Sequence, residues 1–181
     1  MAADGAIVVF LIGPDEWRRG HQMQTPVWAS DDHPPPSMSP KGLRQLIGRR
    51  MERDTDGAVR AIVMDREDQG KGESNVEFFE RLIEQHRVRV LFAIWPANAK
   101  ILGLTFELGM WAKDPNRPQL LLFVEEVVMK GTDADGWTLT EEGNRTTYLA
   151  DVAKSADHVQ RWKDVEALID AVVERASALV L

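Results

Sequence analysis

The sequence has no cysteine, a single tyrosine and fewer basic than acidic residues. The lack of cysteine excludes disulfide scaffolds, thiolate nucleophiles, thiolate zinc sites and iron–sulfur clusters together. Lys and Arg number 22 against 29 Asp and Glu, which gives a net charge of −7. Because proteins that coat nucleic-acid phosphates are normally basic, this balance disfavours broad nucleic-acid binding. The apolar runs, such as Ala6 to Ile12, are too short to span a membrane.

The remaining composition is that of an ordinary globular protein. The chain has 181 residues, of which 44% are hydrophobic and 28% are charged. This length predicts a single domain, residues 1–181, that buries its own core. The first five residues carry no positive charge and do not resemble a signal peptide. We therefore expect a soluble cytoplasmic protein.

Short runs of apolar and β-branched residues predict five strands. Ala6 to Ile12 is continuously apolar and ends at Gly13-Pro14, as is typical of a strand buried on both faces in a parallel sheet. The other four predicted strands are Ala58 to Met64, Val88 to Trp95, Gln119 to Val124 and His158 to Trp162.

Helical signals separate these strands. Ser39-Pro40 predicts an N-cap followed by proline in the first turn, and Ser74 with Glu77 forms a capping-box pattern. Two further helices are expected over Gly103 to Lys113 and from about Lys163. Alternation of strand and helix favours a three-layer α/β fold of the flavodoxin-like (Rossmann-like) type. Its five-stranded, mainly parallel sheet is expected in the order 2-1-3-4-5.

In open sheets of this type, ligands bind beyond the carboxyl ends of the strands, where the strand order reverses. That point lies between the first and third strands. The residues expected there follow the first three strands or open the helix after the third: Gly13, Pro14, Asp65, Asp68, Trp95, Asn98 and Gly103.

Glu107 is the candidate catalytic residue. It falls about one turn into the helix that begins at this point, and helical side chains tilt back toward the helix N-terminus. Its neighbours Phe106, Leu108 and Trp111 would partly desolvate the carboxylate. A carboxylate in that setting suits a nucleophile or a general base. The alternative interpretation is a glutamate that only stabilises the helix dipole.

The segment Gly103 to Gly109 (GLTFELG) resembles the G-T-x-F-E-L-G signature of nucleoside 2-deoxyribosyltransferases and related nucleotide N-glycosidases. The strand ending Ile12-Gly13-Pro14 is similar to that family's opening strand and its G-P turn. In the family the matching glutamate attacks the anomeric carbon of the sugar, so the resemblance implies Glu107 as nucleophile. It also implies that Gly103 and Thr105 contact substrate. The family often completes its site with a neighbouring subunit, which makes a homo-oligomer one expected arrangement.

Cleavage of an N-glycosidic bond passes through an oxocarbenium-like centre that a buried carboxylate stabilises. The expected substrate is a nucleoside, a nucleotide or an NAD-like molecule. Asp65 and Asp68 would hold ribose hydroxyls or the base, or are simply polar residues of a loop. Trp95, Trp17 or Trp28 would stack on the base. Each tryptophan equally fits plain core or interface packing. The histidines show no metal-ligand spacing, so neither a metal nor a cofactor is expected.

Two other functions stay open. One is a TIR-like NAD hydrolase, because TIR domains share this strand order and also use a glutamate on a helix near the sheet. The other is a nucleotide-sensing module without turnover. The family commonly has an aspartate about six residues before the glutamate, where this chain has Ile101. The family also often has a tyrosine near the first strand, whereas the single tyrosine of this chain is Tyr148. That difference favours the sensing module.

Overall fold

The protein is described by a computed structural model. The residues that the structure describes are 5–14, 16–18, 22–31, 36–64, 68–97, 99–100, 102–112, 117–132, 136–141 and 149–181.

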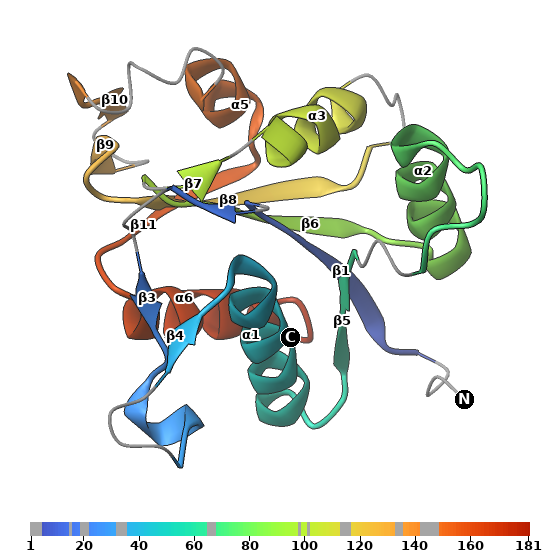
Figure 1. The fold of residues 1–181 in the computed structure, drawn as a ribbon, viewed down its shortest axis with the longest axis horizontal. Coiled ribbons are helices and arrows are strands. Elements are labelled where there is room, and N and C mark those ends of the chain that lie inside the picture. Colours follow the sequence, from blue (N-terminus) through green and yellow to red (C-terminus); the bar gives the residue numbers. More distant parts are fainter. Residues whose placement is uncertain are drawn as a thin grey trace.

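A five-stranded parallel sheet forms the middle layer (Figure 1). Its strands are β1 (Ile7–Ile12), β5 (Val59–Val63), β6 (Val90–Trp95), β8 (Gln119–Glu125) and β11 (His158–Trp162). They lie in the order β11-β8-β6-β1-β5 and all neighbours are parallel. Counted along the chain, this is the predicted order 2-1-3-4-5, and the three-layer α/β fold is confirmed.

The apolar character of the strands reflects burial on both faces. Every residue of β6 is buried, as are the last four residues of β1. Strand β5, at one edge of the sheet, is only partly covered. There the Glu52 carboxylate accepts a hydrogen bond from the Ala61 amide (3.1 Å), which satisfies a backbone donor of the edge strand.

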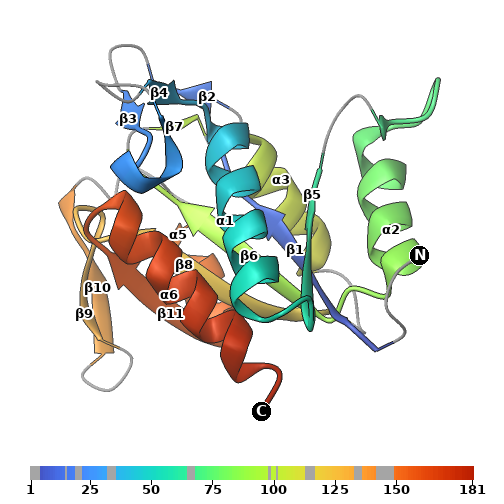
Figure 2. The same ribbon diagram turned by 90° about the horizontal axis from the view of Figure 1, so that it is seen from below.

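Helices cover both faces of the sheet (Figures 1 and 2). On one face α1 (Pro40–Asp54) and α6 (Val165–Ala178) pack over one apolar cluster. On the other, α2 (Asn75–His86), α3 (Leu102–Trp111) and α5 (Leu149–Ser155) pack over a second cluster. The predicted caps are present: Ser39 accepts from the Gly42 amide, and Ser74 and Glu77 form a capping box.

Short strand pairs lie at the ends of the sheet. Pairs form between β2 (Glu16–Trp17) and β7 (Ala99–Lys100), between β3 (Met23–Gln24) and β4 (Ser37–Met38), and between β9 (Met129–Thr132) and β10 (Gly136–Leu139). A 3-10 turn, η1 (Val27–Ala29), lies between β3 and β4. The region 15–39, which shows no clean period in the sequence, thus contains local β structure. Figure 2 shows β2, β3, β4 and β7 gathered at the end of the sheet where α1 begins.

None of the helices in the described residue ranges combines the length and apolar character needed to cross a bilayer.

Close contact between α1 and the sheet depends on Gly48. A Cβ atom added there would lie 3.1 Å from the Ala61 Cβ, tighter than an ordinary contact. We expect Gly48→Val to lower the free energy of unfolding by about 1–3 kcal/mol, because the methyl groups of valine would overpack the contact between α1 and β5. The control Gln45→Val places the same side chain at an exposed position of α1. Urea unfolding measures both, and equal effects of the two changes would contradict the prediction.

Candidate functional site

The strand order reverses between β1 and β6, and the carboxyl ends of these strands define the candidate crevice. Gly13 and Pro14 leave β1 at this point, and both residues are buried. A Cβ atom added to Gly13 would meet Arg44 and the Ile94 Cβ at 3.5–3.6 Å, which is ordinary van der Waals distance. Protein packing therefore does not by itself require glycine at position 13.

Arg44 is a functional candidate that the sequence analysis missed. It lies in the second turn of α1 and is only 9% exposed. Its Nη1 atom donates a hydrogen bond to the Pro14 carbonyl oxygen at 2.6 Å. The sequence does hold a signal, because Arg44 precedes Ile47 and Met51 by three and seven residues and so shares their buried face. A basic residue that shares the helical spacing of apolar residues predicts a charge that is buried in the fold.

Glu107 is the second buried charge. It lies in the second turn of α3 and is 6% exposed. On the same helix Leu104, Leu108 and Trp111 form a fully buried stripe, and Glu107 lies at its edge. The Glu107 side chain is thus largely shielded from solvent. In the described parts of the chain, Arg44 and Glu107 are the only charged side chains that are buried.

Polar contacts fix the segments around the crevice. Strands β2 and β7 pair Glu16 with Lys100, whose side chains also form an ion pair. This ribbon joins the segment after Gly13-Pro14 to the segment that leads into α3. From the end of β8, the Glu125 carboxylate accepts a hydrogen bond from the Ala97 amide at 2.7 Å. The turn after β6 is therefore held from two sides.

The other expected site residues divide into three groups. Gly103 and Thr105 lie in the first turns of α3, near Glu107 in the chain. Trp95 is 1% exposed and packs within the core cluster beneath α2, α3 and α5, so it shows the core packing given above as the alternative. Asp65 and Asn98 lie outside the described residues.

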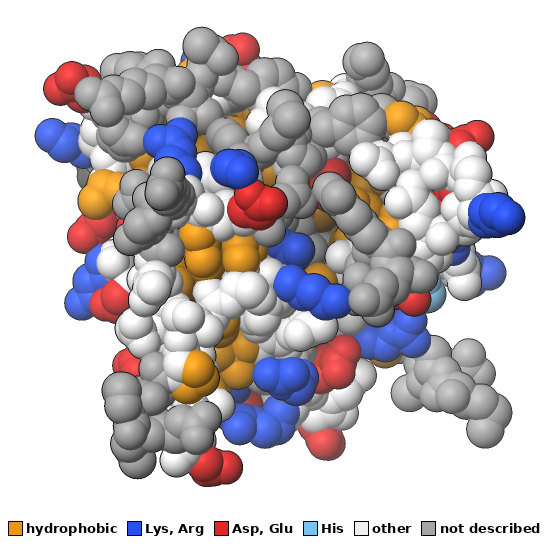
Figure 3. Space-filling view, viewed as in Figure 1, with side chains coloured by type: hydrophobic (Ala, Val, Ile, Leu, Met, Phe, Trp, Pro, Cys, Tyr) orange, Lys and Arg blue, Asp and Glu red, His pale blue; other side chains and the backbone are white. Residues whose placement is uncertain are grey.

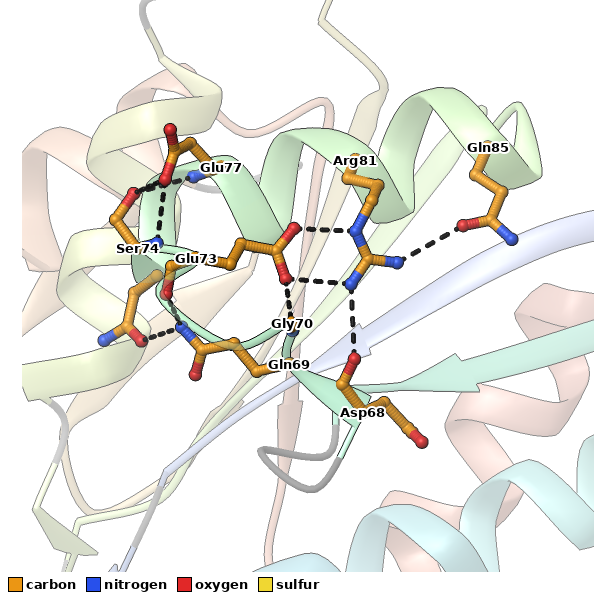
Figure 4. Close-up of polar contacts among 9 residues, drawn as sticks. Asp68, Gln69, Gly70, Glu73, Ser74, Glu77, Arg81 and Gln85 are labelled. Atoms are coloured by element: carbon orange, nitrogen blue, oxygen red, sulfur yellow. Dashed lines mark hydrogen bonds and ion pairs between the residues drawn. The ribbon is translucent and has the colours of Figure 1, made fainter.

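Asp68 is exposed and belongs to a polar network that joins residues 68–74 to α2 (Figure 4). The Arg81 guanidinium binds both oxygens of the Glu73 carboxylate at 2.7 and 2.9 Å. It also donates to the Asp68 carbonyl oxygen at 3.2 Å. Glu73 in turn accepts a hydrogen bond from the Gly70 amide at 2.8 Å. Arg81 thereby positions the backbone of Asp68 from helix α2.

The remaining candidate tryptophans are placed differently. The Trp17 indole donates to the Met38 carbonyl oxygen at 2.6 Å and ties β2 to β4. Trp28 is 47% exposed, and its ring lies 5.1 Å from the Arg50 guanidinium carbon. Of the two, Trp28 has the more accessible ring.

Neither a cluster of metal ligands nor a broad single-sign surface stands out. In the described ranges, no three His, Asp or Glu side chains are grouped closely enough to hold a metal ion. On the face shown in Figure 3, acidic and basic side chains are interspersed. Among the described residues, the charged groups buried in the helices nearest the crevice are the Glu107 carboxylate and the Arg44 guanidinium.

The ion pair with Arg81 lowers the pKa of Glu73 from 4.5 to about 2, with the Gly70 amide contributing. Because the pKa falls on folding, the contribution of this carboxylate to local order is complete above about pH 4.5 and is lost as the pH falls through about 2. We expect carboxyl NMR to follow this titration near pH 2. In Arg81→Gln the pKa should return toward 4.5. An unchanged Glu73 titration in that variant would contradict the ion pair.

Comparisons with known proteins found a distant structural match. No family model matches it, and no curated protein shows significant similarity to it. Among solved structures, it is similar to the conserved hypothetical protein BatB from Bacteroides thetaiotaomicron, at 12% sequence identity and a TM-score of 0.45. The match covers 97% of this chain and 98% of that chain.

Proposed function

We propose that the protein cleaves or exchanges the N-glycosidic bond of a nucleoside, a nucleotide or an NAD-like molecule, with Glu107 as the nucleophile. The observation that carries this proposal is the burial of the Glu107 carboxylate near the start of α3, the helix that follows β6 at the crevice. The resemblance of Gly103 to Gly109 to the deoxyribosyltransferase signature supports the same residue.

The chemistry follows from the burial. Departure of the base leaves positive charge on the anomeric carbon, and a carboxylate in a low-dielectric pocket stabilises that charge strongly. Attack by a Glu107 oxygen forms a glycosyl ester while the bond to the base breaks and its electron pair leaves with the base. Water then hydrolyses the ester, or a second base replaces the first. Both outcomes retain the configuration at the anomeric carbon.

The residues around Glu107 have separate roles in this proposal. The backbone at Gly13 and Pro14 leaves β1 at the crevice, beside the Arg44 side chain, and borders the sugar. Thr105 and Gly103 lie on the same helix as the nucleophile and border the sugar. Asp68, positioned through Arg81, binds a ribose hydroxyl from the β5 side.

The central experiment compares Glu107→Gln with wild type. Incubation with nucleosides, nucleotides and NAD, followed by chromatography, should show release of free base by wild type and a loss of about 10³-fold or more in the variant. Glu80→Gln removes an exposed carboxylate from α2 and should keep full activity. Circular dichroism checks that both variants fold.

The products of this assay discriminate between the functions. Base exchange with an added free base favours the transferase reaction, and nicotinamide release without exchange favours a TIR-like hydrolase. Binding without any release of base, unaffected by Glu107→Gln, would identify a sensing module and overturn the proposal.

Gly13→Ala separates folding from substrate binding. The added Cβ meets protein atoms only at ordinary distances, so the free energy of unfolding should change by less than about 1 kcal/mol. If the sugar lies against this backbone, the methyl group should lower kcat/KM about 10-fold or more. Urea unfolding and steady-state kinetics measure the two effects. Full activity in Gly13→Ala would show that the turn at Gly13-Pro14 does not contact the substrate.

A further inference from the structure

Strand β5 lies at the edge of the sheet, so one side of its backbone has no neighbouring strand in the described part of the chain (Figure 2). The Ile7 amide donates a hydrogen bond to the Ala58 carbonyl oxygen, and Ile7 pairs with Val59 in the parallel register. In such a ladder, successive residues turn their amide and carbonyl groups to opposite sides. The even-numbered residues of β5 therefore face β1, whereas Val59, Ala61 and Val63 face the free edge.

Two side chains at the end of α1 occupy this free edge in place of a further strand. The Val59 amide donates to the Thr55 hydroxyl oxygen, and the Ala61 amide donates to the Glu52 carboxylate, both at 3.1 Å. Thr55 is the C-cap of α1 and follows Glu52 by three residues, so both side chains lie on the same side of the helix end. They satisfy two backbone donors that another strand would otherwise use.

The edge is not covered along its whole length. Val63, the third residue that faces outward, lines an open hollow of about 300 Å³ together with Gln45, Arg49 and Glu52. Among the described residues, no acceptor is found for the Val63 amide. Unpaired amide and carbonyl groups on an edge strand form a template on which a further strand pairs. Loss of the Glu52 contact would extend this open stretch to Ala61.

A second copy of the same strand fits this edge. In an antiparallel pair centred on Ala61, each Ala61 lies opposite the other and Val59 lies opposite Val63, so the outward-facing groups meet one another. Arg60 then lies opposite Ile62, and no two like charges of the strand face each other across the pair. The edge is therefore complementary to itself about a two-fold axis, which is the commonest symmetry of protein dimers.

We propose that Glu52 holds the β5 edge closed against a second copy of this chain, and that two copies pair through β5 when this contact is removed. Thr55 contributes in the same way at Val59. The end of α1 thus acts as a built-in inhibitor of association between sheets. The inference concerns the edge strand and not the crevice, so it goes beyond the proposed function and stands independently of it.

The first test compares Glu52→Ala with Glu52→Gln, because glutamine keeps an oxygen that accepts the Ala61 amide. Sedimentation velocity from micromolar to near-millimolar concentration should show association of Glu52→Ala beyond that of wild type, whereas Glu52→Gln should sediment like wild type. Glu80→Ala removes an exposed carboxylate from α2 and controls for the change in net charge. Adding Val63→Pro to Glu52→Ala removes an outward-facing donor and should reverse the association.

The absence of native cysteine allows the register of the pair to be measured. Glu52→Ala copies that carry Arg60→Cys are mixed with Glu52→Ala copies that carry Ile62→Cys and are oxidised in air. The two positions lie directly opposite each other in the proposed pair, at a spacing that suits a disulfide. We expect more cross-linked dimer in the mixture than in either variant alone, and less when both copies retain Glu52.

Hydrogen exchange tests the contact in the wild type itself, which decides the matter even if Glu52→Ala does not fold. After correction for intrinsic rates, the Ala61 amide should exchange about 10-fold or more slowly than the Val63 amide. In dilute Glu52→Ala the two amides should exchange at similar rates.

Four results would overturn the proposal. They are equal protection of Ala61 and Val63 in wild type, association of Glu52→Ala no greater than that of wild type, equal association in Glu52→Gln or Glu80→Ala, and association that persists with Val63→Pro or cross-links in another register. The proposed function is judged separately by base release from wild type, which does not depend on the β5 edge.

Discussion

Burial of two opposite charges at one edge of a parallel sheet is the constraint on which the candidate site depends. In a parallel α/β unit each helix runs back along the sheet, so it begins at the edge where the preceding strand ends. Arg44 and Glu107 each lie in the second turn of such a helix. Their burial opposes folding through desolvation, whereas a charged site in a water-poor crevice makes electrostatic interactions with a ligand stronger.

The segments at the strand ends are held mainly by polar contacts. The β2–β7 ribbon, the Glu125 contact to the Ala97 amide and the Arg81–Glu73 ion pair each tie a segment at a strand end to a neighbouring element. The apolar clusters, in contrast, fix the sheet and helices. The scaffold therefore supplies rigidity, and these polar contacts set the position of the backbone that a ligand would meet.

The sheet was predictable because its strands are continuously apolar and bounded by turn residues. His158–Trp162 was predicted with its observed bounds, and the caps at Ser39 and Ser74 were identified from local patterns. Helix α5 was missed, although Leu149, Val152 and Ala153 have helical spacing, because seven residues give a weak periodic signal. Arg44 was missed for a different reason: its contact with Pro14 spans 30 residues and depends on the packed fold.

The carboxylate arrangement also bears on the type of displacement. Inverting and retaining glycosidases both use a pair of carboxyl groups, and in the retaining enzymes one of the two is the nucleophile. In the parts of the chain that the structure describes, Glu107 is the only buried carboxylate, and Asp68 is exposed to solvent. In the covalent displacement that we propose, a Glu107 oxygen first bonds to the anomeric carbon and then leaves it. The acceptor that enters in the second step would depend on how well water is excluded from the crevice, so hydrolysis and base exchange would be two outcomes of this proposed mechanism.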